Sequence, residues 1–400
     1  MATEVIDAPD RRRYEFRIDG KTAGSSEYVR TGDVVAFTHT EIVRSREGRG
    51  WAGPHCARPW TTSATRGCPS CHCARSSRSG SPVTASTRTW STGRRRSRGT
   101  AMTDYGRDVA FGVFPTPSAD PADLRTLWAV LAAAEHGGLE FAGIQDHPYQ
   151  RAHLDTWTLM AAVLSRTERL RVFPDVTNLP LRSPAIIAKA AASLDVLSDG
   201  RFELGLGAGA FWDAVAAMGG RARAPREAAD ALLEAVEVIR LLWSDARSVR
   251  FEGEHYRLSG VRPGPAPAHD IGIWLGVLGP RLLRALGRVA DGWLPSSGYA
   301  RPAQLADMHA RIDAGAAEAG RDPASIRRAY NVWGSITDGS SGGFLEGPVE
   351  QWVDELTELV LEYGMDTFVF GPAAEPVAQV SRFAAEVAPA VREAVLAERG

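Results

Sequence analysis

The pair Asp146–His147 contains the residue types in this sequence that are best suited to proton transfer. An imidazole gains or loses its proton near pH 7, and neighbouring groups set which form is present. A histidine that caps or packs against a helix is an equally good interpretation when the pair is considered alone. His147 is therefore a candidate catalytic residue whose assignment depends on its surroundings in the fold.

A run of alternating glycines, Gly205, Gly207 and Gly209, ends the stretch RFELGLGAG at 201–209. Because glycine has no Cβ, such a run lets a flat or phosphorylated ligand lie against bare backbone. A strand that ends in a glycine turn has the same pattern, so these residues alone leave both interpretations open.

A second glycine-containing stretch, GVLGPR at 276–281, stands directly before a predicted helix. Gly276, Gly279 and Pro280 leave free amides at the positive end of the helix dipole. Arg281 adds a fork of donors that suits a phosphate. The stretch predicts a phosphate site, with a glycine-lined entry to a structural helix as the alternative.

Eight strand–helix repeats are predicted between residue 108 and the end of the sequence, and they position these candidates. The expected strands cover 109–115, 141–146, 170–177, 202–207, 271–277, 292–295, 330–336 and 367–370. The expected helices cover 121–135, 156–166, 185–197, 225–243, 280–289, 302–319, 349–363 and 377–397. Short, continuous apolar strands suit a parallel sheet that is covered by helices. We therefore predict an α/β fold, a (β/α)8 TIM barrel, ahead of an open doubly wound sheet.

Functional residues of such barrels gather where strands end and loops begin. The Asp146–His147 pair and both glycine stretches stand at predicted strand ends, as do Asp175, Thr177 and Asn178. We therefore expect all of them at one rim of the barrel. The stretch 251–261 does not fit the repeat and predicts an inserted hairpin.

Three stretches together carry a resemblance to a known family: GIQDH at 143–147, VTNLPLRSPAIIAKAAASLDVLSDGRFELGLGAG at 176–209, and IWLGVLGPRLLRALGRVADGWLPS at 273–296. The sequence resembles the bacterial luciferase-like flavin- and deazaflavin-dependent oxidoreductases along essentially all of 108–400. The resemblance implies a barrel that binds FMN or the deazaflavin coenzyme F420 at its carboxyl-terminal mouth. It also implies a homodimer, which members frequently form.

The resemblance also implies roles for the candidate residues. His147 becomes the proton donor or acceptor beside the reactive ring. Deazaflavin members carry a non-proline cis peptide at about 174–177, where this sequence has Pro174 in place of a small polar residue. Ala210 and Phe211 stand where some of these members have a Glu, so that role is not carried over. The implied cofactor-binding residues are Asp146, Asp175, Thr177, Asn178, Gly205, Gly207, Gly209, Gly276, Gly279, Pro280 and Arg281.

With F420 the expected reaction is hydride transfer to or from a small organic substrate, and with reduced FMN it is monooxygenation. The Asp–His pair favours F420. A flavin-binding protein without turnover and an acetyltransferase-like remnant in the first fifty residues are the alternatives from other classes. No metal cofactor is expected.

The first hundred residues differ in composition from the rest. Residues 13–40 predict a small antiparallel sheet. The first fifty residues resemble the start of a GNAT-type acetyltransferase-like domain, with REGRG at 46–50 at the position of its phosphate-binding turn. Residues 51–101 hold nine Arg and no acid, which predicts a disordered segment, and we hypothesise that it is coding sequence read out of frame. Its four cysteines could bind zinc, but the frame hypothesis explains them without a site.

The overall composition is that of a soluble globular protein. Hydrophobic residues make up 44% of the sequence and the net charge is −2. No apolar run approaches the ~18 residues of a membrane span, and the N-terminus lacks a signal-peptide core. We therefore expect a cytoplasmic protein with a small-molecule substrate and with neither nucleic acid nor a membrane as a partner.

Overall fold

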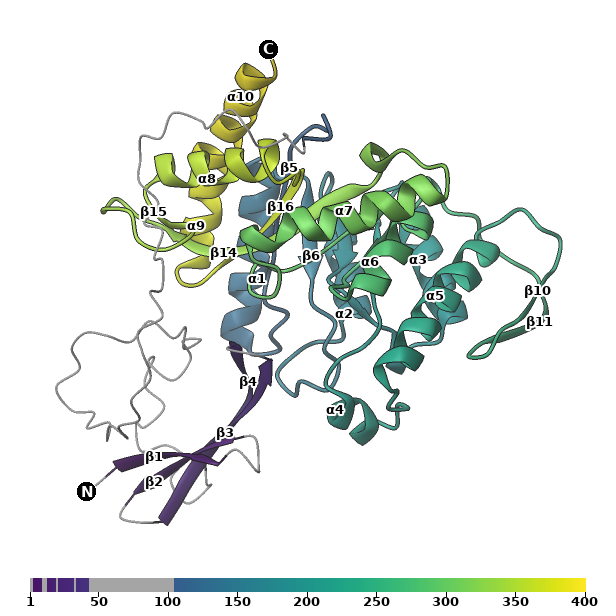
Figure 1. Cartoon of the computed structure of the whole chain (residues 1–400), viewed down its shortest axis with the longest axis horizontal. Helices are drawn as coiled ribbons and strands as arrows, with labels where there is room; N and C mark the ends of the chain where they lie inside the picture. Colours follow the sequence, from purple (N-terminus) through teal and green to yellow (C-terminus); the bar gives the residue numbers. More distant parts are fainter. Residues whose placement is uncertain (1–2, 9–12, 19–20, 32–33, 43–103) are drawn as a thin grey trace. The chain divides into compact units, whose positions relative to one another are not determined.

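The computed structural model describes residues 3–8, 13–18, 21–31, 34–42 and 104–400 (Figure 1). The chain divides into two units, Met1–Ser91 and Thr92–Gly400, and each is described by itself. The predictions for 43–103, which are the disordered segment, the cysteine cluster and the turn at 46–50, lie outside the described residues.

The amino-terminal unit contains one antiparallel sheet in the order β1-β2-β3-β4. Its strands are β1 (Thr3–Ala8), β2 (Arg13–Ile18), β3 (Lys21–Thr31) and β4 (Val34–Ile42). The small antiparallel sheet expected from the sequence is confirmed, and β1 adds a strand that the sequence analysis did not include.

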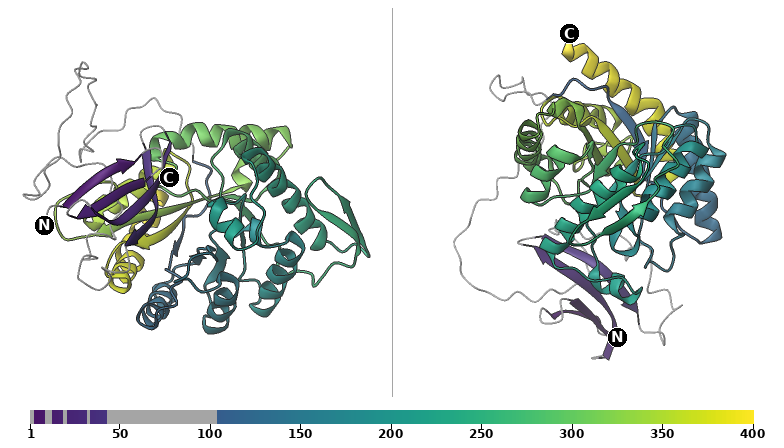
Figure 2. Two further views of the ribbon diagram at one scale, coloured as in Figure 1. Left: turned by 90° about the horizontal axis from the view of Figure 1, so that it is seen from below. Right: turned by 90° about the vertical axis from the view of Figure 1, so that its right-hand side faces the viewer.

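The second unit is a barrel of parallel strands surrounded by helices (Figures 1 and 2). Around the ring the order is β7-β6-β5-β16-β14-β13-β12-β9-β8. A bridge between Val172 and Phe202 joins β7 to the residues before β9 and closes the ring. The strands are β5 (Ala110–Val113), β6 (Phe141–Ile144), β7 (Arg171–Pro174), β8 (Thr177–Asn178), β9 (Leu204–Gly207), β12 (Ile273–Leu275), β13 (Gly292–Trp293), β14 (Arg327–Ile336) and β16 (Thr367–Pro372). The predicted (β/α)8 barrel is confirmed.

Most helices match the predicted ranges to within two residues, because proline marks many of their first turns. They are α1 (Pro121–His136), α2 (Thr156–Arg166), α3 (Pro184–Leu197), α5 (Pro225–Leu242), α6 (Pro280–Val289), α7 (Pro302–Glu318) and α8 (Val349–Leu361). The helix predicted for 377–397 is present as α9 (Pro376–Arg382) and α10 (Ala388–Arg399), which a π-helical turn, Phe383–Val387, joins without a break in helical conformation.

Several smaller elements complete the unit. A short helix, α4 (Trp212–Ala217), follows the glycine run and was not predicted. The expected hairpin insertion is present as β10 (Val249–Glu252) and β11 (Arg257–Val261). A short strand, β15 (Glu346–Gly347), pairs with the end of β14. No helix among the described residues is long and apolar enough to cross a membrane.

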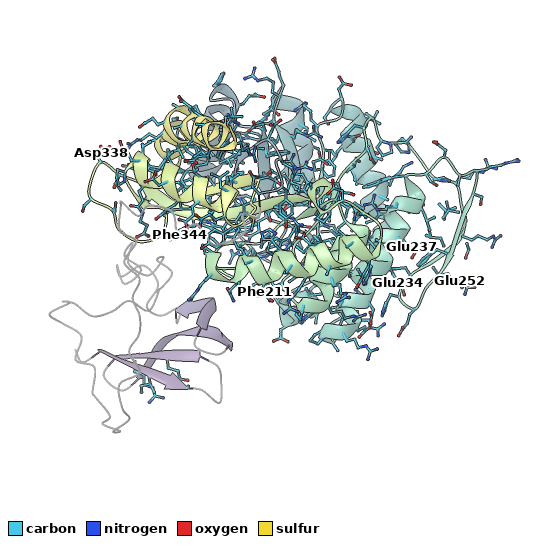
Figure 3. All side chains as sticks on the ribbon, turned by 45° about the horizontal axis from the view of Figure 1, so that its top comes forward. Phe211, Glu234, Glu237, Glu252, Asp338 and Phe344 are labelled. Carbon is cyan, nitrogen blue, oxygen red and sulfur yellow. The ribbon has the colours of Figure 1, made fainter. Side chains whose placement is uncertain are left out.

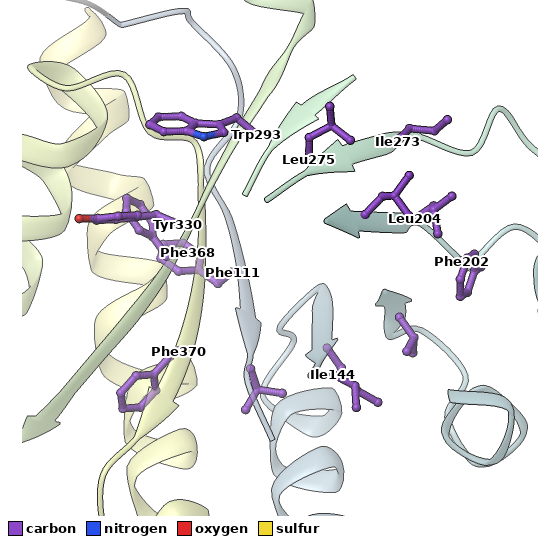
Figure 4. Close-up of a cluster of buried hydrophobic side chains, with 14 of the residues drawn as sticks. Phe111, Ile144, Phe202, Leu204, Ile273, Leu275, Trp293, Tyr330, Phe368 and Phe370 are labelled. Atoms are coloured by element: carbon purple, nitrogen blue, oxygen red, sulfur yellow. The ribbon is translucent and has the colours of Figure 1, made fainter. Parts of the chain in front are cut away.

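The centre of the barrel is filled with side chains. Phe141, Phe173 and Trp274 pack against one another with ring centroids 5.0–6.1 Å apart. They belong to a buried cluster that also contains Ala110, Leu294, Ala329 and Val369. The residues that alternate with these along the same strands point outwards and pack against the helices. Figure 4 shows this for Phe111, Tyr330 and Phe368. Because the centre is closed, a ligand can enter only near the ends of the strands.

Candidate active site at the mouth of the barrel

The mouth of the barrel is formed by the residues that follow the filled central layer by two positions on each strand, towards the carboxyl-terminal end. Because side chains alternate along a strand, these residues face the same lumen as the filled layer. Glycines stand at many of these positions, and the polar residues Asp175, Ser296 and Asn331 stand at others. Ser296 and Asn331 are adjacent, and Asp175 lies across the lumen from them. The sequence therefore builds an open upper layer on a closed floor. The glycines of this layer are Gly112, Gly143, Gly207, Gly276 and Gly371.

Asp175 and Asn331 form a buried polar contact across the lumen. Asn331 Nδ2 donates to Asp175 Oδ1 at 3.1 Å and to Ser296 Oγ at 3.3 Å. Burial raises the pKa of Asp175 to about 7, although the hydrogen bond from Asn331 opposes this shift. Asn331 was not predicted, and the only sequence signal was a lone amide in the apolar stretch AYNVW of β14.

Several buried oxygens of the mouth have no hydrogen-bond partner. Eight buried side-chain oxygens of the described residues lack a partner, and five of them belong to residues of the mouth or of the loop that follows β6. Buried polar atoms are normally paired, so such a concentration needs an explanation. A polar ligand that reaches these atoms would supply one. The five residues are Tyr149, Asp175, Thr177, Asn178 and Asn331.

Asp146 is buried, and both of its carboxylate oxygens are occupied by protein donors. Oδ2 accepts from the backbone N–H of Asn178 at 3.0 Å and from Arg182 Nε at 3.1 Å, and Oδ1 accepts from Arg182 Nη2 at 3.2 Å. Arg182 also pairs with Asp155, the N-cap of α2. Asp146 therefore holds the loop after β8 in place. Arg182 was not predicted, because its pairing depends on the fold.

His147 is half-buried between two aromatic rings. Its imidazole stacks on Tyr149 at a centroid distance of 5.3 Å and meets the edge of Phe211 at 5.4 Å. Burial lowers the pKa of His147 to about 4, with His153 acting in the same direction and Asp146 against it. The imidazole is therefore neutral at pH 7 and can accept a proton there. Phe211 comes from the start of α4, and its ring is 39% exposed at the surface of the unit (Figure 3).

A non-proline cis peptide joins Asp175 to Val176, between β7 and β8. This is within the stretch for which the family resemblance implied such a bond, and Pro174 does not prevent it. A Cβ on Gly205 would lie 2.0 Å from the carbonyl oxygen of Pro174, and one on Gly207 would lie 2.7 Å from Val176 Cγ2. These glycines thus allow the segment 175–178, which carries the cis peptide and forms one wall of the mouth, to lie close to β9.

The other predicted glycines differ in their surroundings. Gly276 also contacts the Val176 side chain, since its Cβ would lie 3.0 Å from Cγ1. Gly209 has a φ of +104°, and its Cβ would lie 2.4 Å from Pro180 Cγ. Gly279 is the N-cap of α6, and no atom lies within 4 Å of the position of its Cβ. Of the predicted glycines, Gly279 alone has open space that a ligand could use.

Pro280 opens α6, as expected, but the Arg281 side chain has another partner. Its guanidinium pairs with Asp230 of α5 at the exposed surface. The start of α6 keeps the free amides that a phosphate would need. The Arg281 guanidinium would have to break its ion pair with Asp230 before it could donate hydrogen bonds to a phosphate at this site. The described residues contain no cluster of His, Cys, Asp and Glu that could hold a metal ion.

Comparison with known proteins identifies the family. Residues 106–341 match the model described as luciferase-like monooxygenase. The chain belongs to this family. The match begins after the first hundred residues, so the acetyltransferase-like resemblance of residues 1–50 gains no support and stays a prediction. The membership expected from the sequence is confirmed, and with it the class of luciferase-like oxidoreductases.

Curated relatives of the chain include F420-dependent enzymes. An F420-dependent glucose-6-phosphate dehydrogenase of Nocardia farcinica is 33% identical over 223 residues, which are 54% of this chain and 66% of the relative. An F420-dependent hydroxymycolic acid dehydrogenase of Mycobacterium tuberculosis is 32% identical over 263 residues, 59% of this chain and 72% of the relative. The chain thus spans about two thirds of the length of such relatives.

Solved structures share the barrel. An F420-dependent secondary alcohol dehydrogenase in complex with an F420-acetone adduct aligns with a TM-score of 0.64 at 21% identity, covering 71% of this chain and 99% of that one. A type II Baeyer-Villiger monooxygenase from the CAM plasmid of Pseudomonas putida, in complex with FMN, has a TM-score of 0.58 at 16% identity with the same coverage. At these identities the likeness establishes the fold.

Proposed function

We propose that this protein is an oxidoreductase that uses F420 to move a hydride to or from a small organic substrate at the mouth of the barrel. The observation that carries the proposal is the position of His147. Its imidazole is neutral and half-buried, and it follows β6 at the same end of the barrel as the partnerless oxygens. The names of the curated relatives support F420 over FMN.

The residues of the mouth fit a flat, polar cofactor. The wall at 175–178 offers partnerless polar atoms on Asp175, Thr177 and Asn178, where the edge of a ring could bind. The open space at Gly279, together with the free amides at the start of α6, suits a phosphate. Gly205 and Gly207 would act indirectly, by allowing the wall to approach. F420 supplies a two-electron hydride acceptor or donor.

The chain supplies the proton chemistry and the positioning. Neutral His147 can take the proton from a substrate hydroxyl, and its protonated form can return one to a carbonyl oxygen. Asp146 is a positioning residue, because it fixes Arg182 and the backbone of Asn178. The apolar layer of Phe141, Phe173 and Trp274 closes the floor against water.

We also propose that the protein is a cytoplasmic homodimer. Ile186 and Leu197 on α3 are 66% and 84% exposed and lie on one side of the helix, eleven residues apart, with Val196 beside them. An exposed apolar stripe of this kind supports an interface between two copies. Size-exclusion chromatography with light scattering would test the dimer, and a monomer at micromolar concentration would contradict it.

Fluorescence titration of the full chain tests the cofactor assignment. F420 and FMN each change emission on binding, and we expect F420 to bind with the lower Kd. Tighter binding of FMN would assign the site to flavin chemistry instead. Binding of neither cofactor would overturn the proposed function.

A further inference from the structure

We propose that the protein has a second binding site, for an oxyanion, formed by Arg223, His255 and Tyr256 beside the start of α6. The ligand that fits it is a phosphate or carboxylate group. The inference goes beyond the proposed function, because neither the proton transfer nor the wall of the mouth uses these residues. Three observations carry it: a fixed hairpin turn, buried donors without partners, and an arginine without an acid.

The turn of the β10–β11 hairpin is fixed to α5. Glu234 of α5, which is labelled in Figure 3, accepts hydrogen bonds from three consecutive backbone N–H groups of this turn. Its Oε1 accepts from Glu254 at 2.8 Å, and its Oε2 accepts from His255 at 2.9 Å and from Tyr256 at 3.1 Å. The Glu234 carboxylate is therefore occupied by backbone donors, and the two ring side chains leave the turn from a fixed backbone.

Four polar atoms of the cluster are buried without a hydrogen-bond partner. They are Arg223 Nε and Nη1, His255 Nε2 and Tyr256 Oη. The Arg223 guanidinium lies 5.8 Å from the centroid of the Tyr256 ring, and all three residues are half-buried, so the cluster borders the surface. Each of the four atoms can donate a hydrogen bond, and the guanidinium nitrogens can only donate. A group with several acceptor oxygens would complete them.

The charge of Arg223 reaches the Tyr256 hydroxyl. Burial raises the pKa of Tyr256, and Arg223 opposes this shift while Glu234 adds to it. The guanidinium and the hydroxyl are therefore close enough to bind one ligand together. A charged donor strengthens the hydrogen bond to an ionised acceptor, so this pair favours an anion over a neutral ligand.

Arg223 has no acidic partner, although the arginines on both sides of it do. Arg221 pairs with Glu227 at 2.7 Å, and Arg226 lies 3.9 Å from Asp230. Within the part of the chain that the structure describes, Arg223 makes no ion pair. A cation that is partly removed from water is costly unless a negative charge lies beside it. Arg223 is thus available to an anionic ligand.

The cluster lies next to the helix start that suits a phosphate. Arg281, the second residue of α6, pairs with Asp230 of α5. The hydrogen bond from Arg281 has the largest effect in lowering the pKa of Asp230, and the charge of His255 acts in the same direction. His255 and Arg281 therefore lie close to the same carboxylate. A ligand with one phosphate at Gly279 can place a second anionic group here, and a free oxyanion can occupy the site by itself.

Inorganic phosphate is the probe that tests the site. Phosphorus NMR titration of the full chain without cofactor, at constant ionic strength, measures its binding. Gly279→Ala is the background, because this change fills the open space of the other candidate phosphate site. We expect saturable binding with a Kd of about 1 mM. Absence of saturable binding would overturn the inference.

Three substitutions in that background locate the ligand. Arg223→Gln removes the charge and should raise the Kd for phosphate about tenfold or more. Tyr256→Phe removes only the hydroxyl and should raise it about threefold to tenfold. Arg221→Gln, the matched control, removes an exposed charge two residues away and should leave the Kd within about twofold.

An unchanged Kd in Arg223→Gln, or an equal loss in Arg221→Gln, would show that phosphate responds only to the general charge of this surface and would overturn the site. Circular dichroism checks that each variant is folded. If Arg223→Gln does not fold, Tyr256→Phe decides, because it keeps both the cation and the ring. An unchanged Kd in Tyr256→Phe would then overturn the site.

Titration with F420 on proteins with Gly279 intact identifies the source of the oxyanion. If an anionic group of F420 fills the site, Arg223→Gln should raise the Kd for F420 about tenfold or more, and phosphate should not bind at Arg223 in the loaded protein. If the ligand is a free oxyanion, the Kd for F420 should stay within about twofold and phosphate should bind there with or without F420. Either result supports the site. Failure of the proposed function differs from both, since F420 would then not bind while phosphate still does.

Discussion

The two ends of the barrel differ in the pairing of their buried side-chain oxygens, although guanidinium nitrogens of Arg171 and Arg328 near the strand starts also lack a partner. At the amino-terminal end, the acids near the strand starts are engaged by protein donors. At the carboxyl-terminal end, the oxygens of Thr177, Asn178 and Asn331 are buried without partners, as is one oxygen of Asp175. Where buried polar groups contribute only to stability, a fold normally pairs them with protein donors. The difference indicates that the mouth is built to receive a ligand and the opposite end is built to hold the barrel together.

Asp195 and Glu203 illustrate the closed end. Asp195 accepts from the backbone N–H of His269 at 3.0 Å and pairs with its Nδ1 at 2.7 Å. Glu203 pairs with Arg171 and accepts from the backbone N–H of Gly272 at 2.7 Å. These contacts join segments that are far apart in the sequence. Substitutions at this end should therefore change stability, and substitutions at the mouth should change binding or rate.

The largest effect is expected at the mouth, from His147→Ala. Loss of the proton acceptor should lower kcat by about 10²–10⁴-fold. The Kd for F420 should stay within about twofold, because the imidazole is not needed to hold the cofactor. Steady-state kinetics and fluorescence titration measure the two quantities. The exposed His136→Ala, at the end of α1, serves as the control, and an equally slow control would remove the assignment.

Gly205→Ala should behave as a stability variant although Gly205 lies in the predicted cofactor run. Its Cβ would lie 2.0 Å from the carbonyl oxygen of Pro174, so the backbone must move, at a cost of about 3 kcal/mol of unfolding free energy. Gly298→Ala meets no atom within 4 Å and is the matched control. Urea unfolding compares them. Equal stabilities would show that the wall is not packed as described.

Asp195→Ala should weaken the closed end without affecting the mouth. The change leaves two donors of His269 unpaired, which should reduce the unfolding free energy by about 2 kcal/mol. Below the unfolding transition, the affinity for F420 should equal that of the wild type. A variant with unchanged stability but weaker cofactor binding would reverse the roles that we assign to the two ends.

Gly279→Ala should have the opposite profile to Gly205→Ala. No atom of the protein opposes a Cβ at this position, so stability should change by less than about 0.5 kcal/mol. The methyl group would occupy the open space beside the amides of α6 and should raise the Kd for F420 about tenfold. Calorimetric titration measures the affinity. A Kd within a factor of two of the wild type would exclude this helix end as the phosphate site.

The smallest effects are expected in the pH dependence, and they differ in sign between the two ends. The hydrogen bond to Glu203 raises the pKa of His269 against the effect of burial, so its contribution to stability is complete below about pH 6.5 and is lost as the pH rises through the raised folded value. The lowered pKa of His147 means that stability falls as the pH drops from about 6.5 towards 4.

Unfolding of His269→Ala and His147→Ala between pH 4.5 and 8 separates these contributions. The deficit of His269→Ala relative to the wild type should shrink as the pH rises. For His147→Ala, the stability relative to the wild type should improve as the pH falls. The acid limb of kcat/KM should also lie near pH 4 and not near 6.5. Parallel pH dependences of the two variants would contradict the comparison.

Local signals in the sequence were sufficient to predict the barrel. Proline at the first turn marked helices such as α1 and α6, and short apolar runs marked the strands. The Asp146–His147 pair was placed correctly because it directly follows a strand. The short helix α4 was missed because six residues after a glycine run carry too little periodicity. The π-helical segment at Phe383–Val387 could not be predicted, because the apolar residues there keep nearly the spacing of an α-helix.

The roles of individual site residues were harder to predict, because they depend on contacts between distant segments. Gly205 and Gly207 were expected to face a ligand, but the structure packs them against the wall at 174–176. Arg281 was expected at the phosphate site, and it pairs with Asp230, fifty-one residues earlier. The pairing of Asn331 with Asp175 spans 156 residues. Residue type and spacing identify the rim, whereas pairing across the barrel becomes visible only in three dimensions.

A crystal structure of the full chain with F420 bound tests the central claim most directly. The account predicts that the ring lies within about 4 Å of Val176, on the wall at 175–178, with His147 facing its reactive edge. It also predicts the phosphate at the amides that follow Gly279. A cofactor bound at the amino-terminal end of the barrel, or at the mouth with His147 turned away from the ring, would contradict the account.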